Sequence, residues 1–313
     1  MDIRKVTSKE DIDCFIESWE IVFQRKLDKD IYAWIFSKRN NIYCCFDGNS
    51  IVAAYCLLDI EALIDNKTHR GALCNNVYVN GFKYIKMGIF SQITEYALND
   101  ISNKGYTFAL GFPNEKAIKA HLRSGWKQEH ALPFYEFEIK TLSTAGGSDF
   151  RFKWLSKYES DAFRDIFQLM RRQYDKYSFS LLKDSDFIDW RFEQNPRWDF
   201  DICCIYKNNT LEGFFVSKYF LERRRVHIVD YFFNTKDVVL ASLPKIYNKY
   251  IVEKGVDVDY VDAWCAAGDQ YIFEQAGFLK SVDFSYVIFK DLSENNLSVG
   301  GSPHLVLADN DVF

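Results

Sequence analysis

The sequence has no apolar run long enough to cross a membrane. Its longest uninterrupted apolar stretch, residues 51–58, is far shorter than the roughly 20 residues that a transmembrane helix needs, so no membrane span is expected. The N-terminal residues lead into the acidic residues Glu10, Asp11 and Asp13 and not into an apolar segment, so no secretory signal is expected either. These two absences predict a cytoplasmic protein.

The sequence also has no CxxC pair, although it contains 8 cysteines. Zinc sites and redox motifs place cysteines at such short, regular spacings. The cysteines lie mostly inside apolar stretches, as is typical of reduced thiols in a protein core. They are Cys14, Cys44, Cys45, Cys56, Cys74, Cys203, Cys204 and Cys265. We therefore expect neither disulfides nor a metal centre.

An excess of basic residues is missing as well. The chain has 39 basic and 44 acidic residues and a net charge of −5, which weighs against a general nucleic-acid-binding protein. With 48% hydrophobic and 27% charged residues, the composition is that of ordinary globular proteins. A chain of 313 residues is long enough for two domains.

An internal repeat supports two similarly folded domains. Residues 42–55 and 202–214 both predict two strands joined by a polar turn. In each half an amphipathic helix then ends at a Lys-Gly pair, at Gly105 and Gly255, and a buried strand follows. Each half closes on a glycine followed by an aromatic residue. Four matches in the same order are typical of a duplicated domain.

The predicted boundaries follow from this repeat. The first domain is expected to cover residues 1–142, and the second residues 149–292. Between them, residues 143–148 are small and flexible in composition and predict a linker. Residues 293–313 show no periodicity and are predicted to be a loop-like tail without a chemical role.

The first half contains a candidate phosphate-binding turn. A predicted strand, residues 72–79, leads through the turn at residues 80–86 into a helix that opens near Gly88. A helix N-terminus behind a glycine presents unpaired backbone N–H groups and the positive end of the helix dipole, which suit a phosphate or pyrophosphate. Lys83 and Lys86 could add positive charge there.

The residues that follow resemble a known family. The run GFPNE at residues 111–115 is followed by Ala117, His121 and the pair Gly125-Trp126. This pattern resembles the end of the GNAT fold of acyl-CoA-dependent N-acyltransferases, and residues 77–91 look like the loop that binds the pyrophosphate of acyl-CoA. That loop usually reads Gln/Arg-x-x-Gly-x-Gly/Ala.

This chain keeps the first glycine of that loop as Gly88 but has Ile85 and Phe90 at the two flanking positions.

The resemblance implies an α/β (α+β) protein of two tandem GNAT-like domains, each a mixed, mostly antiparallel sheet flanked by helices. The second-half turn, residues 233–240, contains no glycine, so the first domain is expected to bind acyl-CoA and the second the acceptor. The residues predicted to contact acyl-CoA are Val77, Tyr78, Val79, Lys83, Lys86, Met87, Gly88, Ile89, Phe90, Ser91, Asn114 and Ala117.

Direct attack of an amine on the acyl thioester is the chemistry that the resemblance implies. Backbone N–H groups near Val77 and Val79 would stabilise the oxyanion. In the family a tyrosine often protonates the leaving thiolate, and His121 holds that position here. A histidine can carry out such a proton transfer near neutral pH, although a structural helix histidine is an equally good interpretation.

Two further residues are candidates for the site. Asn76 could orient a reacting group, and Asp230, on the matching strand of the second half, could act as a general base. His227 lies three residues earlier on that strand and is expected to point to the opposite face. Asp262 and Cys265 are weaker candidates, and an ordinary structural role is favoured for all of these second-half residues.

The second half also contains the triplet Arg223, Arg224 and Arg225, which predicts either a solvated turn or an anion clamp. Tyr231 and Trp264 could stack on a base or a sugar. The tandem arrangement resembles bacterial sugar N-acyltransferases. It implies a nucleotide-linked amino sugar as acceptor, for example a dTDP-3-amino-3,6-dideoxyhexose destined for surface polysaccharide, and an acetyl or 3-hydroxybutanoyl donor.

Two alternatives stay open at this stage. The acceptor could be a peptide, a protein or a small amine. The departures at Ile85, Phe90 and His121 would also suit a non-catalytic protein that senses acyl-CoA.

Overall fold

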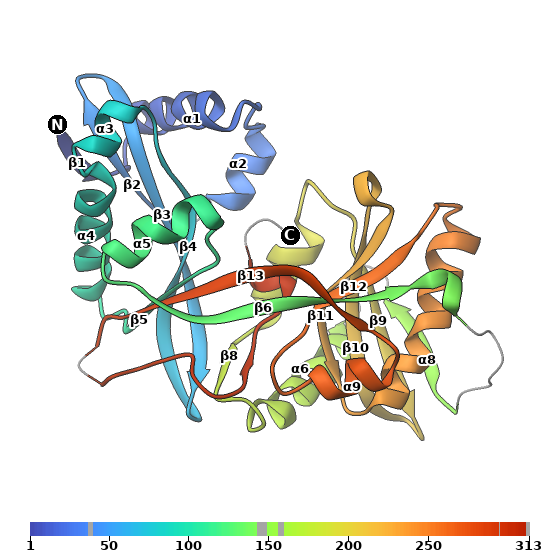
Figure 1. The fold of residues 1–313 in the computed structure, drawn as a ribbon. Coiled ribbons are helices and arrows are strands. Elements are labelled where there is room, and N and C mark those ends of the chain that lie inside the picture. Colours follow the sequence, from blue (N-terminus) through green and yellow to red (C-terminus); the bar gives the residue numbers. More distant parts are fainter. Residues whose placement is uncertain (37–39, 143–148, 156–159, 294, 311–313) are drawn as a thin grey trace. The chain divides into compact units, whose positions relative to one another are not determined.

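The computed structural model describes residues 1–36, 40–142, 149–155, 160–293 and 295–310 (Figure 1). It contains two compact units. Unit 1 comprises residues 1–131 and 285–299, and unit 2 comprises residues 132–284 and 300–313. No helix among the described residues is long and apolar enough to span a membrane. All eight cysteines are free thiols.

Unit 1 is built on a six-stranded sheet in the order β1-β2-β3-β4-β5-β13. All neighbours are antiparallel except β4 and β5, which are parallel. The strands are β1 (Asp2–Lys5), β2 (Asn40–Asp47), β3 (Ser50–Ile64), β4 (Lys67–Val79), β5 (Phe108–Gly111) and the end of β13 (Leu279–Asp291). The helices are α1 (Lys9–Phe23), α2 (Lys29–Ile35), α3 (Phe82–Lys86), α4 (Ile89–Ser102) and α5 (Glu115–Arg123).

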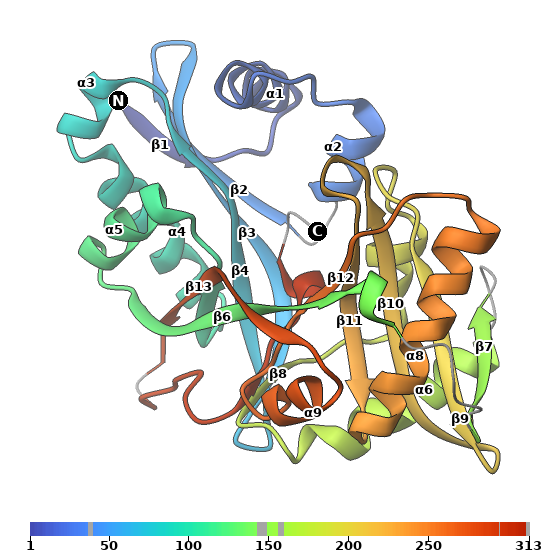
Figure 2. The same cartoon turned by 45° about the vertical axis from the view of Figure 1, so that its right-hand side comes forward.

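Helices cover the two faces of this sheet, with α4 and α5 on one and α1 and α2 on the other (Figure 2). A hydrophobic cluster lies between the sheet and the helices on each face. On one face, the apolar side of α4, with Ile89, Ile93 and Ala97, packs on alternate residues of β2 and β3. On the other face, Phe15 and Trp19 of α1 pack on the remaining residues of the same strands. Both faces of these strands are therefore buried, which explains their nearly continuous apolar sequence.

Unit 2 repeats the arrangement of unit 1 strand for strand. Its sheet has the order β6-β12-β11-β10-β9-β7, and only β11 and β12 are parallel. The strands are the end of β6 (Lys127–Glu138), β7 (Arg151–Leu155), β9 (Asp201–Lys207), β10 (Thr210–Phe220), β11 (Arg225–Phe233) and β12 (Tyr260–Trp264). The predicted fold class, two mixed and mostly antiparallel sheets flanked by helices, is confirmed, and the duplication inferred from the sequence has a structural counterpart.

The remaining elements of unit 2 surround this sheet, and α6 and α8 pack against it. They are η1 (Ile139–Thr141), α6 (Ser160–Tyr174), β8 (Phe179–Leu181), α7 (Ser185–Ile188), η2 (Asp189–Glu193), η3 (Leu221–Arg223), α8 (Lys236–Tyr247), η4 (Asn248–Glu253), α9 (Gln270–Gln275), β14 (Pro303–His304) and η5 (Leu307–Asp309).

The sixth strand of each sheet comes from the other half of the sequence. Residues 288–291 of β13 pair with β5 in unit 1, and residues 134–138 of β6 pair with β12 in unit 2. The two compact units therefore differ from the predicted division at residue 142, because each half of the chain supplies one strand to the other unit. The predicted linker, residues 143–148, lies outside the described residues.

The C-terminal segment belongs to the core of unit 2, in contrast to the predicted loop-like tail. Its strand β14 pairs with β8, and residues 305–307 are fully buried. The ring of His304 stacks on Phe232 with centroids 4.2 Å apart, and its Nε2 lies 3.1 Å from the carbonyl oxygen of Tyr231.

A buried ion triad fixes the same segment. Lys183 Nζ donates a hydrogen bond to Asp230 and pairs with Asp309, with 2.9 Å to one oxygen of each. Burial alone would lower the pKa of Lys183, but the two carboxylates raise it above its usual range. Burial raises the pKa of Asp230 to about 6 despite the lysine. The triad thus joins β11 to η5.

The close approach of β4 and β5 yields a first prediction. A Cβ at Gly71 would lie 2.1 Å from Cζ of Phe108, so any side chain there must displace a core ring. Gly71→Ala should lower the free energy of unfolding by about 1–3 kcal/mol, as overpacked cores do. Gly268→Ala is the control, since its Cβ would meet nothing closer than 3.5 Å. Urea denaturation of both variants tests this, and equal midpoints would contradict it.

The triad yields a second prediction. Lys183→Met leaves two buried carboxylates without their cation and should destabilise unit 2 by about 3–5 kcal/mol at pH 8. The loss should be smaller at pH 5. Without the lysine the pKa of Asp230 rises further above about 6, so the carboxyl is neutral at pH 5 and must carry a buried charge at pH 8.

Thermal unfolding at both pH values measures this difference. The control is Lys104→Met, which removes an exposed pair with Asp100 and should cost less than about 1 kcal/mol at either pH. A loss for Lys183→Met that is independent of pH would show that the lysine contributes packing only.

Candidate functional site

The site in unit 1 begins with a bulge in β4. The pairs Cys56–Asn75 and Ala54–Tyr78 enclose one residue on β3 but two on β4, so β4 contains an extra residue at this point. Asn76 takes a left-handed backbone conformation there, with φ of 45°. Its side-chain oxygen accepts a 3.0 Å hydrogen bond from Nε1 of Trp19. The predicted catalytic Asn76 therefore holds the bulge through its side chain.

Beyond the bulge, one edge of β4 has no strand partner among the described residues. The parallel ladder with β5 ends at the pair Cys74–Gly111, while β4 continues to Val79. The N–H of Asn80 donates to Val52 on β3, at 2.7 Å. Since successive residues of a strand face opposite edges, the N–H groups of Val77 and Val79 point to the edge that β5 has left. These are the two N–H groups expected from the sequence.

The chain then forms a glycine turn at the place where the sequence predicts a phosphate-binding turn. Gly88 has φ of 72° and precedes the 14-residue helix α4, and a Cβ at Gly88 would meet no atom within 4 Å. The first turn of a helix leaves its N–H groups without acceptors inside the helix. These groups belong to Ile89, Phe90 and Ser91. As far as the described residues go, the turn thus offers open space, N–H groups without a partner inside the helix and the positive end of the α4 dipole.

The side chains around this turn are mostly exposed. Lys83 and Lys86 reach solvent from α3, and Lys83 Nζ lies 3.7 Å from Asp47. The hydroxyl of Tyr84 donates to the same Asp47 at 2.7 Å, which ties α3 to the end of β2. Both lysines are thus beside the turn, and Met87 is about half exposed.

Other residues predicted to contact acyl-CoA have structural partners. Asn114 caps α5 by accepting from the N–H groups of Lys116 and Ala117, each at 3.0 Å. The hydroxyl of Tyr78 donates to Ser18 in the core on the α1 side of the sheet. The Tyr78 side chain is thus buried on the α1 face of the sheet. The N–H groups of Val77 and Val79, by contrast, point to the open edge of β4.

His121 is a buried residue of the core on the α4 side. Its ring is 3% exposed and lies against the rings of Phe90 and Trp126, with centroids 4.9 and 5.4 Å away. Nδ1 lies 3.0 Å from the carbonyl oxygen of Ala117, and Nε2 lies 3.6 Å from Sγ of Cys74.

Burial lowers the pKa of His121 to about 4. At neutral pH the imidazole is therefore uncharged, and its Nδ1–H donates to Ala117. The geometry favours the structural interpretation of His121 over the acid that the sequence suggested.

Sequence reasoning missed Cys74. This half-buried thiol stands at the last rung of the β4–β5 ladder, beside His121. Tyr55 of β3 also contacts Cys74. Burial raises the pKa of the Tyr55 hydroxyl well above its ordinary value. The cluster of Cys74, Tyr55 and His121 is recognised by its place at the end of the β4–β5 ladder. A single sequence does not show where that ladder ends.

In unit 2 the predicted catalytic and stacking residues are core residues. Asp230 is held by Lys183, and its other oxygen accepts from the N–H of Tyr231. Tyr231 and Trp264 are 0% and 1% exposed, so neither ring can stack on a base or a sugar. These three assignments are corrected. Asp230 belongs to a buried ion triad, and the aromatic side chains of Tyr231 and Trp264 pack the core because both faces of their strands are covered.

The arginine triplet does not form one anion clamp. Arg224 pairs with Asp259 at 3.1 Å, and Arg225 pairs with Glu136 and with Asp262. Arg223 is exposed, 4.0 Å from Asp283. The three guanidinium groups are therefore directed to different carboxylates.

His227 and Asp262 form a pair that the sequence did not predict. They are neighbours in the parallel β11–β12 ladder, and Nδ1 of His227 is hydrogen-bonded to a carboxylate oxygen of Asp262. Asp230 has other partners, so His227 and Asp230 do not form one site, as expected.

Comparisons with known proteins agree with this geometry. Residues 2–128 match the family model described as acetyltransferase (GNAT) domain. No curated protein matches the sequence.

Several solved structures share the fold of the chain. A probable N-acyltransferase from Enterococcus faecalis has a TM-score of 0.74 at 11% identity, over 93% of this chain and 72% of that one. A GCN5-related N-acetyltransferase from Anabaena variabilis has a TM-score of 0.72 at 12% identity, over 93% and 73%. N-myristoyltransferase from Saccharomyces cerevisiae, solved with bound myristoyl-CoA, has a TM-score of 0.58 at 11% identity, over 93% and 78%. Residues 2–128 thus match a GNAT domain model, and the fold of the chain is similar to that of these solved structures.

Proposed function

We propose that the protein is an acyl-CoA-dependent N-acyltransferase whose donor site is in unit 1. The observation that carries the proposal is the combination of the open β4 edge with the glycine turn that follows it. The turn before α4 would hold the pyrophosphate through the N–H groups of Ile89, Phe90 and Ser91. The N–H groups of Val77 and Val79 would then face the acyl carbonyl.

The residues of unit 1 would act mainly by positioning. The two backbone N–H groups stabilise the oxyanion that develops when a neutral amine attacks the thioester carbon. The C–S bond then breaks, and the thiolate leaves. A thiol has a pKa of about 8.5, so the thiolate is a good leaving group. Near neutral pH it can then take up the proton that the attacking amine loses.

Nucleotide-linked amino sugars are the acceptor class that we propose to test first. The tandem arrangement supports this class, with acetyl or 3-hydroxybutanoyl as the acyl group. Of the acceptor residues predicted from the sequence, Arg223 has the most exposed side chain (63%).

The direct experiment is release of free thiol from acetyl-CoA and 3-hydroxybutanoyl-CoA. The acceptors are dTDP- and UDP-linked amino sugars, with peptides and simple amines in parallel. Turnover with any amine supports the acyltransferase, and the acceptor used identifies the class. Tight CoA binding without turnover on the whole panel would contradict the proposal and favour a sensor.

The glycine turn yields a third prediction. Gly88→Val adds a β-branched side chain at φ of 72° in the open space of the turn. It should raise KM for acyl-CoA about tenfold or more, because strain and bulk both oppose the approach of pyrophosphate to the backbone.

The matched control for Gly88→Val is at the other end of the same helix. Gly105 follows α4, has φ of 84° and also has no atom within 4 Å of its Cβ position. Gly105→Val carries the same backbone strain and should leave KM unchanged. Equal effects of the two substitutions would place the pyrophosphate elsewhere.

His121 yields a fourth prediction. A buried histidine whose pKa is about 4 in the folded chain and about 6.5 in the unfolded chain binds fewer protons when folded. Its contribution to stability is complete above about pH 6.5 and is lost as the pH falls towards about 4. His121→Phe should flatten the fall in stability over this range, measured as the melting temperature from pH 7 to pH 4.

The same variant tests the acid role. We expect kcat at pH 7.5 to fall by less than about tenfold, since the variant removes no proton donor to the thiolate. A loss of about a hundredfold or more with an unchanged melting profile would show that His121 is the acid after all.

A further inference from the structure

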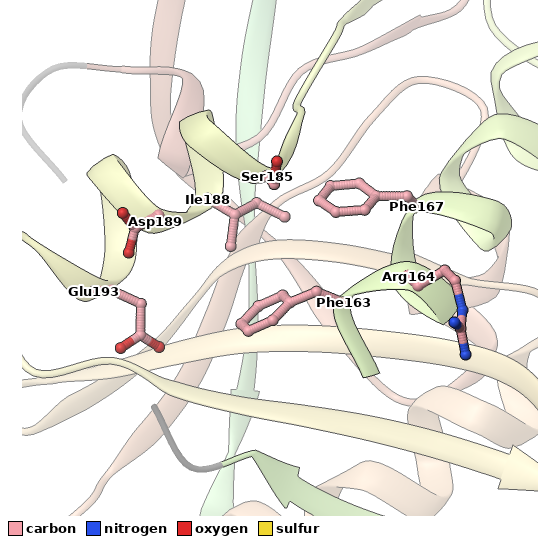
Figure 3. A pocket seen from close by; sticks show the side chains of 7 residues that line it. All are labelled: Phe163, Arg164, Phe167, Ser185, Ile188, Asp189 and Glu193. Carbon is pink, nitrogen blue, oxygen red and sulfur yellow. The ribbon is translucent and has the colours of Figure 1, made fainter. Parts of the chain in front are cut away.

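Unit 2 contains a pocket that the proposed acyl transfer does not use. Its volume is about 380 Å³, within the range of small-molecule sites. The pocket lies between α6 and the segment formed by α7 and η2 (Figure 3). It is lined by Phe163, Arg164, Phe167, Ser185, Ile188, Asp189 and Glu193.

The centre of the pocket is apolar. Phe163 and Phe167 are four residues apart on α6, so both rings lie on one side of the helix. Ile188 of α7 is buried and faces the rings (Figure 3). All three side chains contact the same space, and the two rings are only half-buried. A flat or narrow apolar group would gain most by covering them.

The charges of the pocket are separated. The carboxylates of Asp189 and Glu193 lie at one end, and the exposed Arg164 lies at the opposite end with its guanidinium group turned away from the rings (Figure 3). Asp189 is held in place by Gln194, whose Nε2 donates to its Oδ2 at 2.5 Å. Two carboxylates beside an apolar surface create a negative potential that favours a cation.

We propose that this pocket binds a small amphipathic amine in its ammonium form. The apolar part, a single ring or a short chain, would pack between Phe163, Phe167 and Ile188. The ammonium group would lie at the end formed by Asp189 and Glu193, whose carboxylate oxygens can each accept more than one hydrogen bond. The inference concerns binding alone and does not rest on acyl transfer by unit 1.

Other ligand classes fit the pocket less well. A neutral ligand of the same shape would cover the carboxylates without offering them a charge, which costs solvation. An anion would face the two carboxylates, while the guanidinium group of Arg164 at the opposite end is turned away from the rings. The volume is also too small for a folded segment of a partner protein. Shape and charge together therefore favour one small organic ammonium ion.

Calorimetric titration of the full chain with three matched probes tests the proposal. The probes are 2-phenylethylamine, the neutral 2-phenylethanol and the anionic 3-phenylpropanoate. We expect saturable binding of the amine, at least about tenfold weaker binding of the alcohol, and no measurable binding of the anion. Equal affinity for amine and alcohol would overturn the role of the carboxylates.

Variants then locate the binding site. Asp189→Asn and Glu193→Gln keep the shape and should each weaken the amine about tenfold while leaving the alcohol unchanged. Phe167→Ala should weaken both. Asp186→Asn is the matched control, because Asp186 is an acidic residue of the same α7 segment that does not line the pocket.

Each variant is first compared with the unmodified chain by its melting temperature, so that a folding defect is recognised. Unchanged amine affinity in Asp189→Asn, Glu193→Gln and Phe167→Ala would overturn the proposed site. Because thiol release is not the readout, an inactive acyltransferase would not affect the result.

Discussion

The reciprocal exchange of one strand is the constraint on which both units depend. The sheet of unit 1 is completed by residues 288–291 on β5, and the sheet of unit 2 by residues 134–138 on β12. Strand β5 has only four residues and would otherwise present an unpaired edge. Neither half of the sequence can therefore form its complete sheet from its own strands. The donor site that we propose in unit 1 lies next to a ladder whose outer strand, β13, comes from the C-terminal half.

The two units keep the same framework but use its open edge differently. In unit 2, β11 also contains a bulge, since Val216–Asp230 is followed by Ser217–Ile228, and its ladder with β12 ends at Ile228. Here the C-terminal segment occupies this region: His304 contacts the carbonyl of Tyr231, and Asp309 joins the triad around Lys183. In unit 1 the corresponding region has an accessible glycine turn. The two units thus share one strand arrangement, and in unit 2 the buried residues of the C-terminal segment lie where unit 1 has its glycine turn.

Much of this framework was predictable because local patterns determine it. The paired hairpins, the helix that begins behind Gly88 and the glycine at the end of α4 follow from periodicity and from the need for a positive φ. The strand exchange was not predictable, because nothing in the sequence of β6 or β13 indicates which strand each of them pairs with. The carboxylate partners of Arg224 and Arg225 are likewise distant in sequence, so the sequence alone did not show that both arginines form ion pairs. The bulge at Asn76 depends on register, which a single sequence does not fix.

His121 shows how context decides the chemistry of a residue. Its position after Asn114 suggested a proton donor, yet aromatic rings on several sides remove it from water and favour its neutral form. The leaving thiolate can take its proton from the attacking amine, so the proposed reaction does not require a separate proton donor. Acyl transfer in unit 1 would then demand mainly fixed geometry: two N–H groups on the open edge of β4, and a phosphate anchor at the start of α4. Both are properties of the backbone, so they tolerate the substitutions at Ile85 and Phe90 that separate this loop from the usual pattern.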